Sequence, residues 1–340
     1  MVEQDASATV SVPLEWLPWH ASARTRLETA LVGDRLPHGL LLHGPEGVGK
    51  ELFATVLAAG LFCSQPRSGL TPCGACAECA LSRAGSHPDL HWLRRPEDKK
   101  SIGVDAVREV CDQLGMTSMR GGHRVAIISP ANIMTHNAMN ALLKTLEEPA
   151  PRTLLVLITS RPSALLATLR SRCQRVEVPR PAAAQARSWL AQQLGEEPPD
   201  RLLGLTGGAP LKALAIAAHF SGLEEQMTGL LDALLGGRAE VTRLAAEMLG
   251  EGLPARLDWL EAWLGQAVRA QALPDGTDLT VPGGSLLQRA AAEVNITAAF
   301  RILDRLRESR RLLEGNAAPQ LLIEALLIEL KAAIRRRGVA

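Results

Sequence analysis

Tyrosine is absent from the 340 residues, and phenylalanine occurs only 4 times. Proteins that hold single-stranded nucleic acid stack bases on aromatic rings, so this composition argues against such a stacking surface. An excess of charge of one sign is also missing, because the chain has 37 Lys and Arg and 36 Asp and Glu. A near-neutral chain cannot displace counterions over a broad surface, so any contact with nucleic acid is expected to be local.

Long apolar runs are missing as well. Stretches such as 154–159 and 321–330 fall far short of the ~18–20 apolar residues that span a bilayer, so no transmembrane helix is expected. Residues 1–12 contain Glu3 and Asp5 and no basic residue before an apolar core, which does not fit a secretory or transit peptide. These features predict a cytoplasmic protein.

The first half of the chain alternates short apolar runs with helical stretches. This alternation is typical of an α/β domain with a parallel sheet. The predicted strands are 40–43, 90–93, 124–128, 154–159 and 175–178. The chain has 46% hydrophobic and 21% charged residues, and its length predicts two or three domains with a real core.

After Pro179 and Pro181 the pattern changes, because Ala and Leu recur at helical spacing without a convincing strand. We therefore predict an α/β domain over 1–179, a small helical domain over 180–221 and an all-α domain over 222–340. Two features of this last domain stand out. Residues 272–284 are predicted to form a loop, and the final helix has a broad apolar face over 321–330 that should be buried against other helices.

The first predicted strand leads directly into the residues G-P-E-G-V-G-K-E at 44–51, which a helical pattern follows. This matches the phosphate-binding motif G-x-x-x-x-G-K in its strand, loop and helix setting. Gly44, Gly47 and Gly49 would let backbone N–H groups turn toward phosphate oxygens, and Lys50 would add a positive charge. These four residues are the candidate nucleotide ligands.

Two departures from the pattern of a P-loop ATPase accompany this motif. Glu51 stands where a Ser or Thr hydroxyl would ligate Mg²⁺. The predicted strand 124–128 ends in Ser129 and Pro130, where an ATPase needs carboxylates to hold Mg²⁺ and activate water. We therefore expect no ATP hydrolysis by this chain, and binding of ATP without hydrolysis stays open.

Four cysteines lie within 17 residues, in the spacing C-x₉-C-x₂-C-x₂-C. They are Cys63, Cys73, Cys76 and Cys79. Thiolates at this spacing can converge on one ion, so the segment 63–79 predicts a structural zinc site with a closed tetrahedral shell. The alternatives are four unrelated thiols and an iron–sulfur cluster, although the C-P that ends the ferredoxin run is absent. Cys111 and Cys173 stand apart from this cluster.

Several segments together resemble a known family. They are L-P-W-H at 17–20, the cysteine segment after the P-loop helix, G-S-H-P-D at 85–89, I-G-V-D-A-V-R-E at 102–109, N-A-L-L-K-T-L-E-E-P at 140–149 and L-R-S-R-C at 169–173. In these segments the chain is similar to the clamp-loader ATPases of the AAA+ class, which serve bacterial DNA polymerase III. The resemblance is dense over the first half of the chain. It implies an AAA+ domain over 1–179, a helical lid over 180–221 and a helical collar for oligomerisation over 222–340.

The resemblance also implies a function and partners. It indicates the non-hydrolysing type of clamp-loader subunit within the DNA polymerase III holoenzyme, a DNA-directed DNA polymerase and nucleotidyltransferase complex. Arg172 would be an arginine finger that acts in trans on ATP held by a neighbouring motor subunit. The implied partners are the motor (gamma/tau) and delta subunits, and, through the complex, the sliding clamp and primer-template DNA. The alternative is an active, motor-type P-loop ATPase, and roles for Thr159 and Lys212 stay undecided.

Overall fold

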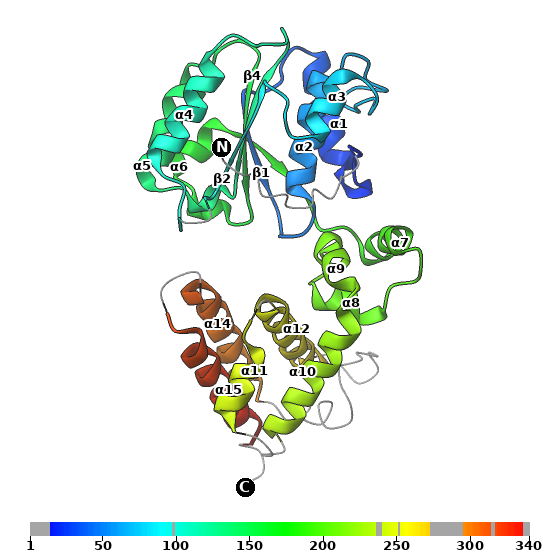
Figure 1. Ribbon diagram of the computed structural model, residues 1–340, viewed down its shortest axis with the longest axis vertical. Coiled ribbons are helices and arrows are strands. Elements are labelled where there is room, and N and C mark those ends of the chain that lie inside the picture. Colours follow the sequence, from blue (N-terminus) through cyan, green and yellow to red (C-terminus); the bar gives the residue numbers. More distant parts are fainter. Residues whose placement is uncertain are drawn as a thin grey trace, which may run out of the picture. The chain divides into compact units, whose positions relative to one another are not determined.

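The computed structural model describes residues 14–96, 99–235, 240–250, 252–272, 295–313 and 317–335. The chain divides into two compact units, Met1–Pro181 and Ala182–Ala340, each with its own interior (Figure 1). The change from one unit to the other falls where the two prolines interrupt the sequence pattern.

The first unit contains a five-stranded sheet in the order β2-β3-β4-β1-β5, and every neighbouring pair is parallel. Its strands are β1 (Gly39–His43), β2 (Leu90–Arg94), β3 (Arg124–Ser129), β4 (Thr153–Thr159) and β5 (Gln174–Glu177). All five predicted strands are present, with ends within one residue of the prediction. The α/β class with a parallel sheet is therefore confirmed.

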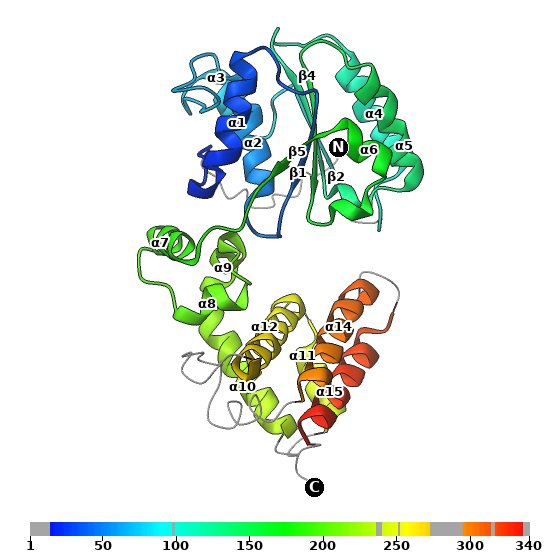
Figure 2. The same ribbon diagram turned by 180° about the vertical axis from the view of Figure 1, so that it is seen from behind.

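Helices cover both faces of this sheet, as Figures 1 and 2 show. One face carries α1 (Ala21–Val32), α2 (Lys50–Phe62) and α3 (Ala77–Arg83), and the other carries α4 (Val104–Gly115), α5 (His136–Glu147) and α6 (Ala167–Arg172). Short 3₁₀ turns are η1 (Pro18–His20), η2 (Ala131–Ile133) and η3 (Pro162–Ala164). The three inner strands are buried along almost their whole length and apolar in their middle, because helices shield both of their faces from water.

The helix α5 shows how the sequence specifies this packing. Thr135 caps its start by accepting a hydrogen bond from the Ala138 backbone at 3.2 Å. Ala138, Leu142 and Leu146 recur every four residues, so they form one buried stripe against the sheet. Helix α5 also packs against α6.

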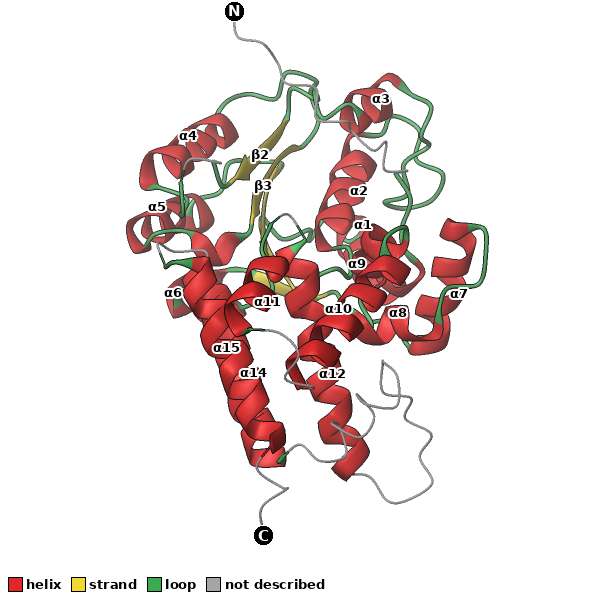
Figure 3. Ribbon diagram, turned by 60° about the horizontal axis from the view of Figure 1, so that its bottom comes forward, coloured by secondary structure: helices red, strands yellow, loops and turns green. Residues whose placement is uncertain are grey.

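The second unit is helical throughout its described part (Figure 3). Its helices are α7 (Ala183–Leu194), α8 (Asp200–Leu205), α9 (Pro210–Ala217), α10 (Phe220–Leu235), α11 (Val241–Met248), α12 (Leu253–Ala272), α14 (Ile296–Leu313) and α15 (Pro319–Arg335). The predicted loop 272–284 lies outside the described residues, apart from its first residue, which ends α12. No described helix is both long and apolar enough to cross a membrane.

The predicted apolar helix near the C-terminus is α15. It buries Ile323, Leu326 and Leu330 completely, because it packs against α11 and α14 of the same unit. Leu321 and Ile328 are left 65% and 56% exposed on its outer side. Packing within the chain thus accounts for most of the apolar face but not for these two side chains.

Candidate functional site

The loop 44–51 directly follows β1 and continues into the first turn of α2, as the motif predicts. Gly47 and Gly49 adopt φ values of 71° and 87°, in the left-handed region that glycine enters without strain. At Gly44, with φ of 150°, a Cβ would lie 2.1 Å from the Val178 carbonyl oxygen. Only glycine fits there, because the loop approaches the backbone beyond β5 so closely.

Lys50 begins α2 and is bonded to the loop itself. Its Nζ donates to the carbonyl oxygens of Gly44 at 2.9 Å and Pro45 at 2.5 Å. The side chain is buried, and it would have to leave these carbonyls to reach a phosphate group. The four candidate nucleotide ligands are thus together, with the ammonium held by the loop.

The two departures from the ATPase pattern contact each other. The hydroxyl of Ser129, at the end of β3, donates a hydrogen bond to Glu51 Oε1 at 2.6 Å. Arg94, at the end of β2, places Nη2 3.6 Å from Glu51 Oε2. The position where an ATPase would hold Mg²⁺ is therefore occupied by a carboxylate that a hydroxyl and a guanidinium already engage. Sequence reasoning missed Arg94, whose position on an edge strand gave no signal.

Thr159 ends β4 and is buried beside the same edge of the sheet. Its hydroxyl donates to Asn132 Oδ1 at 2.9 Å and accepts from the Arg161 backbone at 2.9 Å. Asn132 was not predicted from the sequence, because it lies in the short turn η2 and belongs to no motif. The Thr159 hydroxyl is therefore committed to local hydrogen bonds in this structure.

The four clustered cysteines converge as predicted. Their sulfur atoms all lie within 4.8 Å of one another. Cys63 Sγ is 3.9 Å from Cys76 Sγ, and Cys73 Sγ is 3.9 Å from Cys79 Sγ. Tetrahedral zinc with Zn–S bonds of about 2.3 Å requires sulfur separations of about 3.8 Å. Four cysteines in this arrangement could hold a metal ion such as zinc.

The surroundings of the cysteines orient their sulfur atoms. The backbone N–H of Cys76 donates to Cys73 Sγ at 3.3 Å, and that of Cys73 donates to Cys63 Sγ at 3.3 Å. Burial raises the pKa of the Cys79 thiol to about 12. At Cys76 burial acts in the same direction, but backbone hydrogen bonds from Cys79 and Ser64 outweigh it and lower the pKa to about 6. Such N–H···S bonds stabilise thiolates, the form that binds metal.

The cysteine segment is fixed to the helices beneath it. Leu70, between the first two cysteines, is fully buried, and its backbone N–H donates to Glu28 Oε1 at 3.1 Å. A Cβ at Gly60 in α2 would lie only 2.1 Å from the Leu70 carbonyl oxygen. On α3, Glu78 pairs with Arg120 at 2.5 Å. The segment is therefore an integral part of the first unit.

Arg172 is the last residue of α6, and its side chain is 36% exposed. Its Nη1 donates to the Thr168 carbonyl oxygen at 3.0 Å, and its Nη2 lies 2.5 Å from Glu147 Oε1. The next residue, Cys173, is buried in the core. The candidate arginine finger is thus at the surface of the first unit, anchored through a buried neighbour.

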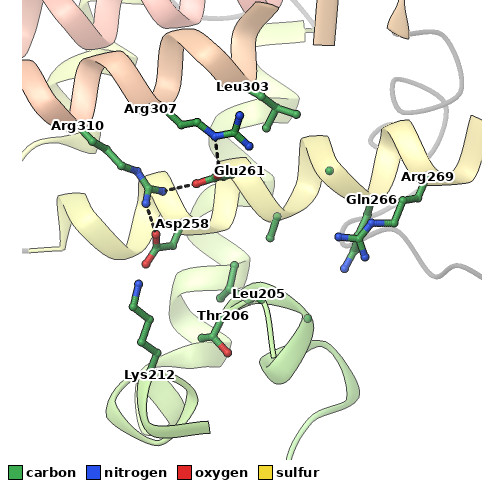
Figure 4. A pocket seen from close by; sticks show the side chains of 14 residues that line it. Leu205, Thr206, Lys212, Asp258, Glu261, Gln266, Arg269, Leu303, Arg307 and Arg310 are labelled. Carbon is green, nitrogen blue, oxygen red and sulfur yellow. Dashed lines mark ion pairs between the residues drawn. The ribbon is translucent and has the colours of Figure 1, made fainter. Parts of the chain in front are cut away.

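Lys212 lies in the second unit, where it lines a cavity of about 300 Å³ with residues of α12 and α14 (Figure 4). Its side chain points toward Asp258. Arg310 pairs with Asp258 at 2.7 Å and with Glu261 at 3.0 Å, and Arg307 is 3.6 Å from Glu261. No motif predicted this cluster, in which the cations Lys212, Arg307 and Arg310 outnumber the two carboxylates.

A five-stranded parallel sheet with helices on both faces, followed by a unit whose described part is helical, is the fold of the AAA+ class. The family model described as "DNA polymerase III, delta subunit" matches residues 19–182. The model described as "DNA polymerase III, delta subunit, C terminal" matches residues 219–332.

Curated relatives specify the family further. DNA polymerase III subunit delta' of Pseudomonas aeruginosa is 36% identical over 323 residues, which cover 92% of this chain and 96% of that protein. The Escherichia coli subunit delta' is 35% identical over 275 residues, 79% of this chain and 81% of that protein. The tau subunit of Escherichia coli is 34% identical over 173 residues, 51% of this chain and 26% of tau. The chain belongs to the DNA polymerase III delta' family, the subunit type that the sequence resemblance indicates.

Proposed function

We propose that this protein is a non-hydrolysing subunit of a DNA polymerase III clamp loader. In this function it joins motor (gamma/tau) and delta subunits in a ring that loads the sliding clamp on primer-template DNA in the cytoplasm. Membership of the delta' family supports the assignment. The main support for the absence of ATP hydrolysis is the hydrogen bond of 2.6 Å from the Ser129 hydroxyl to Glu51.

The chemistry of this contact explains the proposal. A P-loop ATPase holds Mg²⁺ between a hydroxyl on the loop and a carboxylate at the end of a neighbouring strand. Here the two groups have exchanged places, with the carboxylate of Glu51 beside the loop and the hydroxyl of Ser129 on β3. Pro130 follows where a second carboxylate would activate water, and proline has no side chain that accepts a proton.

Arg172 is proposed as an arginine finger for ATP on an adjacent motor subunit. A guanidinium is always charged and can direct two N–H groups at phosphate oxygens. The side chain is accessible at the end of α6, and its backbone is anchored by the buried Cys173. A subunit without its own hydrolysis can therefore still contribute to hydrolysis in the ring.

The remaining parts of the proposal concern the scaffold. Cys63, Cys73, Cys76 and Cys79 hold structural zinc, which closes the segment 63–79. The range 1–179 acts as the AAA+ domain, 180–221 as its lid and 222–340 as the oligomerising collar. Exposure of Leu321 and Ile328 on α15 supports the collar, since large apolar side chains at a surface suit contact with another subunit.

Reconstitution tests the function. The chain is mixed with motor and delta subunits, and loading of the clamp on primed DNA is measured together with ATP turnover. We expect loading only when this chain is present, and no magnesium-dependent turnover by the isolated chain. Turnover by the isolated chain that disappears in Lys50→Ala would instead establish an active, motor-type ATPase. Full loading in the absence of the chain would refute the assignment.

A further inference from the structure

The guanidinium of Arg172 is engaged at both of its terminal nitrogens. Nη1 donates to the Thr168 carbonyl oxygen at 3.0 Å, and Nη2 lies 2.5 Å from Glu147 Oε1. The Glu147 side chain is 49% exposed and that of Arg172 is 36% exposed, so the ion pair lies at the surface of the first unit. The charged end of Arg172 is thus folded back onto its own chain.

The fold holds the two partners of this ion pair near each other. Glu147 is the last residue of α5, and Arg172 is the last residue of α6. Next to Glu147, the Leu146 carbonyl oxygen lies 2.8 Å from Nε2 of His38, just before β1. A Cβ at Gly39 would lie 2.6 Å from Leu146 Cδ2 and 3.4 Å from the Arg172 carbonyl oxygen. The start of β1 therefore packs closely against the ends of both helices.

An arginine finger stabilises a leaving phosphoryl group by directing N–H groups at its oxygens. In Arg172 the two terminal nitrogens that could form such a fork already contact Glu147 and Thr168. We infer that Glu147 is a positioning residue that holds Arg172 on its own chain, and that the phosphates of ATP on a neighbouring subunit compete with Glu147 for the guanidinium. This inference rests on the proposed trans role of Arg172.

The size of the effect follows from the exposure of the pair. Ion pairs between solvent-exposed side chains change an equilibrium by about 1.4- to 5-fold. Removing the carboxylate should favour release of Arg172 by this factor. The part of the kcat/KM for ATP that depends on Arg172 should therefore rise by about 1.4- to 5-fold in Glu147→Gln.

The experiment uses the reconstituted complex with clamp and primed DNA, at ATP concentrations below KM. Six forms are compared: the unchanged chain, Glu147→Gln, Glu147→Asp, Arg172→Ala, the double variant of Glu147→Gln with Arg172→Ala, and Glu148→Gln. The last is a matched control, because Glu148 is the neighbouring exposed carboxylate at the same helix end. The rate that remains with Arg172→Ala is subtracted, which leaves the part that depends on Arg172. Size-exclusion chromatography checks that every complex is assembled.

We expect a rise with Glu147→Gln, no rise with Glu148→Gln, and no difference between Arg172→Ala and the double variant. Glu147→Asp, which keeps the carboxylate, should return the rate toward that of the unchanged chain. An unchanged or lower rate with Glu147→Gln would overturn the positioning role, as would the same rise in the Arg172→Ala background. If Arg172→Ala itself leaves the rate unchanged, the trans role fails first, and the holding role of Glu147 fails with it.

Discussion

His20 lies fully buried beneath the loop 44–51, and we expect its protonation to destabilise the first unit. Its Nε2 is 3.3 Å from the Val48 carbonyl oxygen, which can only accept, so Nε2 carries the hydrogen of the neutral ring. Its Nδ1 is buried without a hydrogen-bond partner among the described residues. The rings of Trp16 and Phe53 surround it. A second proton would thus place an unpaired N–H and a positive charge in an apolar site.

The pKa of His20 gives the size of this effect. Burial lowers the pKa from 6.5 to about 4, and the hydrogen bond to Val48 opposes this only in part. Because the unfolded chain binds the proton more readily, stability is complete above pH 6.5 and is lost as the pH falls toward 4. From these two values, the loss between pH 7.5 and pH 5 is about 2 kcal/mol in the free energy of unfolding.

The assay is urea unfolding at pH 7.5 and pH 5, followed by tryptophan fluorescence, to which Trp16 and Trp19 beside His20 contribute. His20→Gln removes the titrating ring but keeps an N–H donor for Val48. This variant should lose about 2 kcal/mol less between the two pH values than the unchanged chain. His136→Gln, at an exposed position, is the control and should lose as much as the unchanged chain. An equal loss in His20→Gln would refute the reasoning.

Three other predictions concern the scaffold. Gly60→Ala should lower the free energy of unfolding by about 1–3 kcal/mol, because its Cβ would lie 2.1 Å from the Leu70 carbonyl oxygen. Gly229→Ala is the control, because a Cβ there meets nothing within 4 Å, and the higher helix propensity of Ala should raise the free energy of unfolding by about 0.5–1 kcal/mol. Thermal unfolding measures both variants. A change of the same sign in both would contradict the packing argument. Elemental analysis should find about one zinc per chain and a loss of zinc in Cys76→Ser, and full occupancy in that variant would reject the site. Leu321→Glu should weaken ring assembly on size-exclusion chromatography and leave unfolding of the isolated chain unchanged; an intact ring would argue against the collar face.

The strands were predictable because the sheet is covered on both sides. A strand that is buried on both faces appears in the sequence as a short apolar run between more polar segments, so it can be recognised from the sequence alone. The loop 44–51 was predictable from its motif, because the strand before it and the helix after it are contiguous with it in the sequence. The convergence of the four cysteines was predictable for a similar reason, because all four lie between residues 63 and 79.

Contacts between distant residues were not predictable in this way. Glu51 and Ser129 are 78 positions apart, and each was recognised only as a departure from a motif. That the two departures meet depends on which strand ends beside the loop, and no local pattern encodes the strand order. The pairing of Arg172 with Glu147 likewise depends on the packing of α5 against α6.

The strand β1 connects the two functional proposals. At its carboxyl end it carries the loop 44–51, and at its start His38 and Gly39 contact the ends of α5 and α6. Between these points it pairs with β4 on one side and β5 on the other. If this chain hydrolyses no ATP, as proposed, it needs no magnesium ligands at this loop. It still needs β1 at this length and register, because β1 positions the backbone of Arg172. The sheet can therefore be retained in a chain whose magnesium-binding and water-activating residues are replaced.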